Sequence, residues 1–183
     1  MPSNRNNVIF VETDHLILAP HNPSDLLALL RSPEDYQNSS GIRTGEAVRD
    51  FLLQASPDFL ASLGEAVGPD PWKFGFAILH RVDDRMIGLC GFTGPPDNNG
   101  AVEFGYSIAP EYQGKGYATE AARALIDFAT KDARVRTICA HTLSQSNAST
   151  RVLEKCGFTK TKEFVDPEGN RVWRWERAVL KKL

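Results

Sequence analysis

The stretch EYQGKGYATEAARALIDFA, Glu111 to Ala129, places two glycines and a lysine directly before residues with helical spacing. The apolar residues that follow the glycines form one stripe along this predicted helix: Ala118, Ala121, Ala122, Leu125 and Ala129. Glycines allow a backbone to approach a ligand closely. The first N–H groups of a helix lack partners within it and carry the positive end of its dipole. The stretch therefore predicts a binding site for a phosphate or pyrophosphate at the start of a helix.

The segment before this turn, AVEFGYSI from Ala101 to Ile108, alternates apolar residues with polar or small ones. That alternation has the period of a β-strand. Gly105 lies in the middle of it, which indicates a bulge or a close approach of another backbone.

The remaining sequence reads as further strands and helices. Asn22 and Pro23 predict a helix start, Ser39–Gly68 reads as helical segments broken by loops, and a short helix follows Asn147 and ends at Gly157. The predicted strands are His15–Pro20, Trp72–His80, Met86–Phe92, Ala101–Ile108, Arg136–Leu143, Phe158–Val165 and Arg171–Leu180. This order predicts one α/β domain over residues 1–183, with a mixed, largely antiparallel sheet of about seven strands flanked by helices.

Composition excludes several classes of protein. The chain has 183 residues, 42% of them hydrophobic, and a formal net charge of -2, which argues against direct binding of nucleic acid. The three cysteines form no CxxC pair, so we expect free thiols and no metal site. The first ten residues lack the apolar core of a signal peptide, and no apolar run reaches the ~18 residues of a membrane helix. We expect a cytoplasmic protein that does not contact membranes.

The glycine turn does not match the common nucleotide-binding patterns. A P-loop is absent, and Thr119 occupies the position of the third glycine of a dinucleotide-binding turn. Residues 113–118, QGKGYA, instead fit the pattern [QR]xxGx[GA] between a strand and a helix. Together with the segments TDHLILAP and NASTRVLEKCGF, this stretch resembles the GNAT superfamily of acetyl-CoA-dependent N-acetyltransferases, in particular its RimJ/RimL-like branch. The resemblance covers nearly the whole chain apart from Ser39–Gly68.

This resemblance implies a binding mode for acetyl-CoA and a V-shaped split between two central strands, 101–108 and 136–143. Backbone amides, with Thr119 beside them, would surround the pyrophosphate: Gln113, Gly114, Lys115, Gly116, Tyr117 and Ala118. The backbone of Ser107, Ile108 and Ala109 would pair with the pantetheine arm. Asn147 would contact the arm from the other side, although the family's usual asparagine position falls on Ser146, one residue earlier.

Acetyl transfer to an amine benefits from a base, and the resemblance favours Glu103 for that role; the alternative is a solvated glutamate. A backbone N–H near Ile108 is a candidate for stabilising the oxyanion. Leu153 stands where many relatives carry a tyrosine acid, so Ser149 and Tyr106 are the candidate proton donors. A thiol nucleophile at Cys156 is disfavoured, because a cysteine that closes a helix is typically buried in the core. We therefore expect direct attack without an acyl-enzyme.

The acceptor is predicted to be a primary amine, either a small molecule or a protein N-terminus, with Ser39–Gly68 carrying specificity. Four acids in or near that segment would flank the acceptor and either attract it or lie on solvated helix faces: Glu34, Asp35, Glu46 and Asp50. Two alternatives remain: a non-catalytic acyl-CoA-binding or sensing module on the same fold, and a nucleotide-binding protein. A homodimer is a further possibility.

Overall fold

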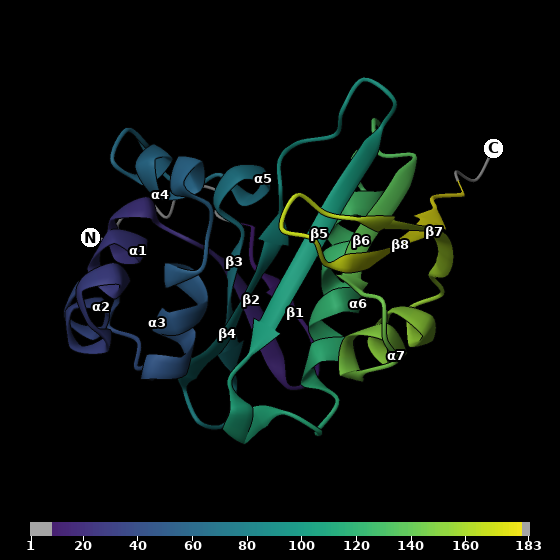
Figure 1. Ribbon diagram of the computed structural model, residues 1–183. Coiled ribbons are helices and arrows are strands. Elements are labelled where there is room, and N and C mark those ends of the chain that lie inside the picture. The colour runs from purple at the N-terminus through teal and green to yellow at the C-terminus, as the bar shows by residue number, and fades with distance from the viewer. Residues whose placement is uncertain (1–8, 181–183) are drawn as a thin grey trace.

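The computed structural model describes residues 9–180 (Figure 1). Residues 1–8 and 181–183 lie outside the described residues. The prediction that the first ten residues are not a signal peptide therefore falls mostly outside the described residues. The strands are β1 Val11–Glu12, β2 Leu16–Pro20, β3 Phe76–His80, β4 Arg85–Phe92, β5 Ala101–Ile108, β6 Thr137–Leu143, β7 Thr159–Val165 and β8 Arg171–Ala178. The helices are α1 Pro23–Arg31, α2 Pro33–Ser40, α3 Glu46–Leu53, α4 Pro57–Leu63, α5 Pro71–Phe74, η1 Pro110–Tyr112, α6 Tyr117–Thr130 and α7 Ala148–Lys155.

The eight described strands form one sheet in the order β1-β2-β3-β4-β5-β6-β8-β7. The mixed, largely antiparallel sheet is therefore confirmed, with β1 as a short strand beyond the seven predicted. Within the described residues β5 and β6 are the one parallel pair, and their pairing covers only Ala101–Glu103 against Thr137–Cys139. Beyond that point the two strands are no longer paired. This is the predicted V-shaped split (Figure 1).

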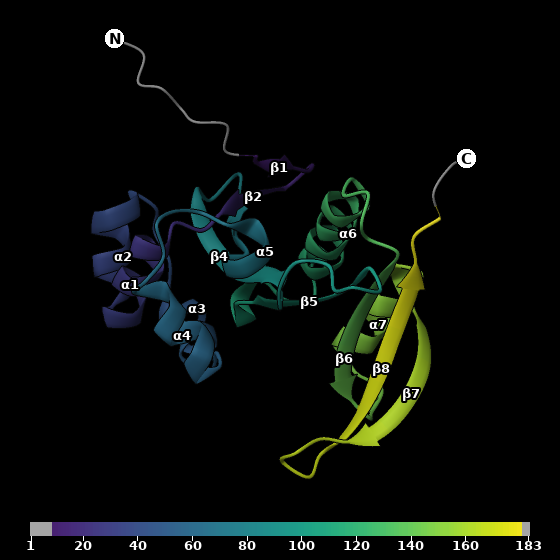
Figure 2. The same cartoon turned by 90° about the horizontal axis from the view of Figure 1, so that it is seen from above.

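Helix α6 lies on the side of the sheet opposite to α3 and α4 (Figure 2). Its inward stripe consists of small side chains around Leu125, and Ala121, Ala122 and Ala129 are fully buried beside it. Small side chains let the helix axis approach the strands, and α6 contacts β2, β4 and β5. The N-terminus of α6 is consequently fixed beside the open end of β5.

The segment Trp72–His80 was wrongly predicted to be strand throughout. Its first part is the short helix α5, and β3 begins at Phe76. Asp70 caps α5 by accepting hydrogen bonds from the N–H groups of Trp72 and Lys73, and Pro71 occupies the first helical position. Trp72 is half-buried and packs against the core, with its ring centroid 4.6 Å from that of Phe92.

Gly105 is neither a bulge nor a point of close approach. It faces Gly91 in an uninterrupted register, and a Cβ at Gly105 would meet nothing within 4 Å. The close approach lies on the next strand, where a Cβ at Gly91 would come within 2.7 Å of the Gly75 backbone. The prediction for Gly105 was wrong because Gly105 faces a second glycine, Gly91, and it is Gly91 that makes the close backbone contact.

Candidate functional site

The turn between β5 and α6 exposes a row of unsatisfied amides. Gly114 (φ 73) and Gly116 (φ 88) adopt left-handed conformations that favour glycine. Gly116 is the N-cap of α6 and offers no side-chain cap. In the described part of the chain, the backbone N–H groups from Gly114 to Thr119 find no hydrogen-bond acceptor. Several free donors thus lie at the positive end of a helix, as an anion site requires.

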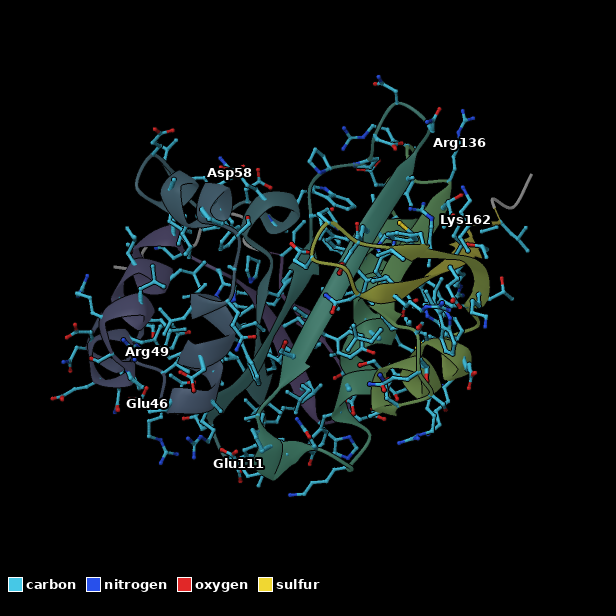
Figure 3. The ribbon with its side chains drawn as sticks, viewed as in Figure 1. Glu46, Arg49, Asp58, Glu111, Arg136 and Lys162 are labelled. Atoms are coloured by element: carbon cyan, nitrogen blue, oxygen red, sulfur yellow. The ribbon has the colours of Figure 1, made fainter. Side chains whose placement is uncertain are left out.

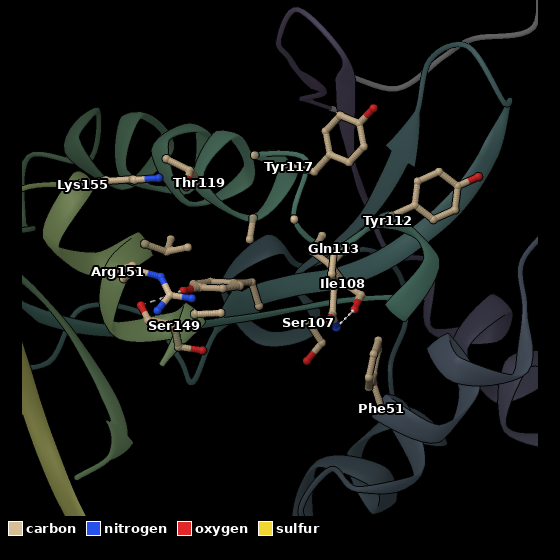
Figure 4. Close-up of a pocket in the computed structure, with 16 residues that line it drawn as sticks. Phe51, Ser107, Ile108, Tyr112, Gln113, Tyr117, Thr119, Ser149, Arg151 and Lys155 are labelled. Carbon is tan, nitrogen blue, oxygen red and sulfur yellow. Dashed lines mark hydrogen bonds between the residues drawn. The ribbon is translucent and has the colours of Figure 1, made fainter. Parts of the chain in front are cut away.

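A cavity of about 430 Å³ opens beside this turn (Figure 4). The structure brings most of the predicted site residues to its wall: Tyr106, Ser107, Ile108, Gln113, Gly114, Gly116, Tyr117, Ala118, Thr119 and Ser149. Ala109, Lys115, Asn147 and Glu103 do not line it. The cavity runs from the glycine turn along Tyr106–Ile108 at the end of β5 to the start of α7.

The pairing of β5 with β4 determines which β5 amides face the split. Ala109 donates its N–H to Ile87 (2.8 Å), and Glu103 accepts from Thr93 (3.0 Å). Successive residues of an antiparallel strand direct their amides to opposite sides. Odd-numbered residues, including Ser107, are therefore engaged with β4, whereas Tyr106 and Ile108 direct theirs toward the split. The Ile108 carbonyl accepts from Gln113 Nε2 at 2.9 Å. The Ile108 N–H is available because the pairing of β5 with β6 covers only Ala101–Glu103.

Tyr106 reaches into the cavity from β5. Its hydroxyl donates to the backbone carbonyl of Ser149 at a long 3.5 Å. Burial raises the pKa of Tyr106 to about 12, although the hydrogen bond to Ser149 opposes that shift. The side chain is thus a neutral hydroxyl donor across the physiological pH range, and both candidate proton donors lie on the same cavity.

Sequence reasoning missed two cations that line the cavity, Arg151 and Lys155 on α7. They are four residues apart, so they share a helix face, and this spacing was a usable signal. Lys155 extends from α7 toward Thr119 at the start of α6 (Figure 4). A neighbouring groove over the same turn has mixed charge: three cations line it, Lys115, Arg123 and Lys155, together with four carboxylates, Glu12, Asp14, Glu120 and Asp127. The turn therefore combines unsatisfied amides with positive side chains.

Glu103 contacts His141, which lies on β6 two residues beyond Cys139, the last residue paired with β5. Glu103 Oε1 lies 2.7 Å from His141 Nδ1, and the carboxylate side chain is 36% exposed. Glu103 lies on the same face of β5 as Gly105, which is about 7 Å away along the strand. His141 had no predicted role, and its pairing with Glu103 depends on the strand register.

A second cavity, of about 560 Å³, lies between β4–β5 and helices α3–α5. Its walls are mainly apolar and include Phe51, Phe59, Phe74 and Leu89. Phe51, Tyr106 and Ser107 line both cavities. The two cavities consequently meet at β5, and a ligand in each would converge on the same short piece of strand.

The acids expected to flank an acceptor do not line the second cavity. Asp35 lies 2.8 Å from Arg31. Glu46 lies 3.4 Å from Arg49 on α3 (Figure 3). These are pairs between neighbouring turns of solvated helices. The residues of Ser39–Gly68 that reach the cavity are instead Phe51, Leu52, Ala55, Ser56 and Phe59.

Asn147 has a structural role at the start of α7. Its side-chain oxygen accepts from the Thr150 N–H at 3.0 Å, and the Thr150 hydroxyl accepts in turn from the Asn147 N–H at 3.0 Å. This reciprocal pair is a capping box, which fixes the helix beside the cavity.

The three cysteines are buried free thiols, as predicted. Cys90 is the one that lines the second cavity, and burial raises the pKa of its thiol. Within residues 9–180, no cluster of histidine, cysteine, aspartate and glutamate has the arrangement of a metal site. No helix in that same range has the length and apolarity to cross a membrane.

Comparison with known proteins extends this picture. The acetyltransferase (GNAT) domain matches residues 15–159. The uncharacterized N-acetyltransferase YjdG from Bacillus subtilis is 32% identical over 133 residues, which cover 69% of this chain and 77% of that protein.

Solved structures share the fold at lower identity. The ribosomal-protein-S5-alanine acetyltransferase from Vibrio fischeri superposes with a TM-score of 0.64 at 19% identity, covering 93% of this chain and 97% of that one. A chimera of the spermidine N-acetyltransferase SpeG from Vibrio cholerae and hSSAT gives 0.62 at 16% identity, covering 90% and 96%. Proteins named for quite different amines thus have the same fold.

Proposed function

The chain belongs to the acetyltransferase (GNAT) domain family, and from that membership we propose that it moves an acetyl group from acetyl-CoA to a primary amine by direct attack, with both substrates bound together. As a member of this family it is an acetyl-CoA-dependent acetyltransferase. We further propose that residues 1–183 form a single acetyltransferase domain. The pairing of β8 with β6, beyond the matched residues, supports this, because the C-terminal strands complete the same sheet.

The donor set around the glycine turn fits coenzyme A. Amides from Gly114 to Thr119 lack acceptors at the start of α6, and Arg151 and Lys155 add positive charge at this point. We assign this point to the pyrophosphate, because hydrogen bonds to charged oxygens each contribute roughly 1.5–3 kcal/mol. When bound, acetyl-CoA supplies an activated thioester; the protein supplies position and charge.

The observation that carries the direct-attack proposal is the meeting of the two cavities at Tyr106 and Ser107. An amine held in the second cavity reaches β5 from the side opposite to the cofactor cavity, so no covalent carrier on the protein is needed. Cys90 is an unsuitable carrier because burial favours its neutral thiol.

We assign the Ile108 N–H to the oxyanion, because Tyr106 and Ile108 direct their amides into the split and the Gln113 side chain fixes Ile108. The Tyr106 hydroxyl stabilises a leaving thiolate by donating a hydrogen bond. Full transfer of its proton is unfavourable, because Tyr106 has a pKa of about 12 and a free thiol titrates near ~8.5.

Glu103 is the proposed base and acts through water. The Glu103–His141 pair lies just beyond the Gly105 end of the second cavity. The distance of about 7 Å along β5 leaves room for one bridging water between the carboxylate and an amine at the cavity. His141 holds the carboxylate in place from β6.

We propose a primary amine as the acceptor. We also propose that the chain belongs to the RimJ/RimL-like branch of the family, so that a protein N-terminus would be one type of acceptor. It is supported by the segment TDHLILAP and by the fold shared with the S5-alanine acetyltransferase. A cytoplasmic location and a homodimer stay predictions.

The test is release of free CoA thiol from acetyl-CoA with a panel of amines, using Glu103→Gln and the exposed control Glu65→Gln. We expect Glu103→Gln to lower kcat about 100-fold with unchanged affinity for acetyl-CoA, and Glu65→Gln to behave as the parent. Absence of thiol release by the parent with every amine, despite tight acetyl-CoA binding, would instead support the non-catalytic sensing module.

A further inference from the structure

The second cavity is built for an uncommon kind of amine acceptor. Its described lining combines aromatic and aliphatic side chains from α3, α4 and α5 with the backbone of β4 and β5. We propose that this cavity selects an acceptor with a single primary amine on an apolar, ring-sized body, and that it rejects polyamines and aminoglycosides. This inference rests on the proposed acetyl transfer and names its substrate class.

The charges around the cavity exclude a polycation. None of the described lining residues is acidic, and Lys73 is the one lysine or arginine among them. His21, which also lines the cavity, is kept neutral by burial, because its pKa is lowered to about 4. A second ammonium group would therefore enter an apolar space without a counter-ion and beside a like charge, which is costly.

The acids of the neighbouring helices do not supply that counter-ion, and Glu103, the proposed base, serves the attacking amine itself. Asp50 and Asp58 lie directly beside the cavity residues Phe51 and Phe59 in sequence, yet both are exposed. Helical spacing accounts for this, because adjacent residues point about 100° apart around the axis. The helices thus turn apolar side chains to the cavity and their carboxylates to solvent.

The aromatic side chains indicate a flat or bulky apolar body. The Phe59 and Phe74 rings lie 6.2 Å apart in an edge-to-face arrangement, and Phe51 continues this wall to the junction with the cofactor cavity. Aromatic walls of this kind favour rings in offset or edge-to-face contact. The cavity volume of about 560 Å³ suits one ring-sized body together with its amine.

This chemistry has two possible sources, a free arylalkylamine and the α-amine of a peptide that begins with an apolar residue. The substrate panel distinguishes them: phenylethylamine, a short peptide beginning with phenylalanine, spermidine and kanamycin. We expect phenylethylamine or the peptide to exceed spermidine and kanamycin at least ten-fold in kcat/KM. Equal or better use of spermidine or kanamycin would overturn the inference while leaving the proposed acetyl transfer intact.

Binding gives an independent readout. Calorimetry on the full chain with CoA present should show phenylethylamine binding at least ten-fold more tightly than spermidine. If no amine releases CoA thiol, the proposed function fails, and this affinity ratio still tests the cavity. Spermidine binding as tightly as phenylethylamine would overturn the inference.

Two variants assign the selectivity to the cavity wall. Phe59→Ala should weaken phenylethylamine binding about ten-fold and leave CoA binding unchanged. The control Leu53→Ala removes an exposed side chain of α3 that does not line the cavity, so it should leave phenylethylamine binding unchanged. Lys73→Glu supplies the missing carboxylate and should raise the spermidine to phenylethylamine ratio at least five-fold. An unchanged ratio in Lys73→Glu, or equal losses in Phe59→Ala and Leu53→Ala, would contradict the proposal.

Discussion

Replacement of Gly116 by alanine tests the glycine turn as the anion site. A Cβ at Gly116 meets nothing within 4 Å, so the substitution causes no clash, but φ is 88. A left-handed residue with a side chain costs roughly 1–2 kcal/mol. For a chain of this size we expect the Tm to fall by about 2–8 °C. Relaxation of that strain would also displace the backbone amides of the glycine turn at the start of α6.

The loss of CoA affinity follows from those amides. Misplacing one hydrogen bond to a charged oxygen loses roughly 1.5–3 kcal/mol. This corresponds to a Kd about 10- to 150-fold higher. Calorimetric titration with CoA measures it, and thermal unfolding in the absence of ligand measures the strain separately. Pantetheine, which lacks the pyrophosphate, should bind Gly116→Ala as it binds the parent.

Gly169 provides the matched control. It has the same φ of 88, a Cβ there also meets nothing within 4 Å, and it lies in the turn between β7 and β8, away from the cofactor cavity. Gly169→Ala should lose similar stability but no affinity for CoA. Equal CoA affinities for the two variants would refute the assignment of the pyrophosphate to this turn.

Three further predictions concern the same cavities. Lys155→Ala should raise the Kd for CoA roughly ten-fold at low salt and less at high salt, whereas the control Lys131→Ala, at the far end of α6, should leave the Kd unchanged. Calorimetry at two salt concentrations measures both variants, and equal increases in Kd for the two would contradict the role of Lys155. Tyr106→Phe should lower kcat about ten-fold, which corresponds to a loss of about 1.4 kcal/mol, and should leave the KM for acetyl-CoA unchanged. Steady-state kinetics that show a change in KM alone would contradict a hydrogen bond from the Tyr106 hydroxyl to the leaving thiolate. His21 has a folded pKa of about 4, below its unfolded value of ~6.5, so the unfolded chain binds more protons in that window. The contribution of neutral His21 to the free energy of unfolding is complete above about pH 6.5, and that free energy should fall by about 3 kcal/mol as the pH decreases to about 4. Denaturant unfolding should show a smaller decrease for His21→Gln, and an identical pH dependence would contradict burial as the cause.

The parts of the fold that sequence predicted well have local signals. The limits of β5 at Ala101 and Ile108 match the alternation, and the start of α6 follows the glycines within a residue. Asn22 caps α1 as predicted, accepting from the Ser24 N–H. Glycine, proline and capping residues act within a few positions of themselves, so a single sequence contains the information.

The site residues that were missed depend on packing between distant segments. Phe51 reaches the junction of the two cavities because α3 packs against β4 and β5. Lys155 reaches Thr119 because α7 packs beside α6. The Glu103–His141 pair depends on a parallel register of only three residue pairs between β5 and β6. Local spacing could place each residue on a helix face or strand face, but it could not select the partner.

The register of β5 also limits what the family resemblance can transfer to this chain. Ser107, Ile108 and Ala109 were all predicted to pair with the pantetheine arm, yet the Ala109 N–H is donated to Ile87, and alternation engages Ser107 with β4 as well. The backbone of Ile108 therefore has to make the polar contact that three residues were expected to share, assisted by Tyr106 two positions earlier. Because Gln113 Nε2 holds the Ile108 carbonyl, the first residue of the glycine motif positions the residue whose amide we assign to the reacting carbonyl. Pyrophosphate binding and acyl-group orientation are thus coupled through Gln113, so Gln113→Ala should impair kcat even where CoA affinity is retained.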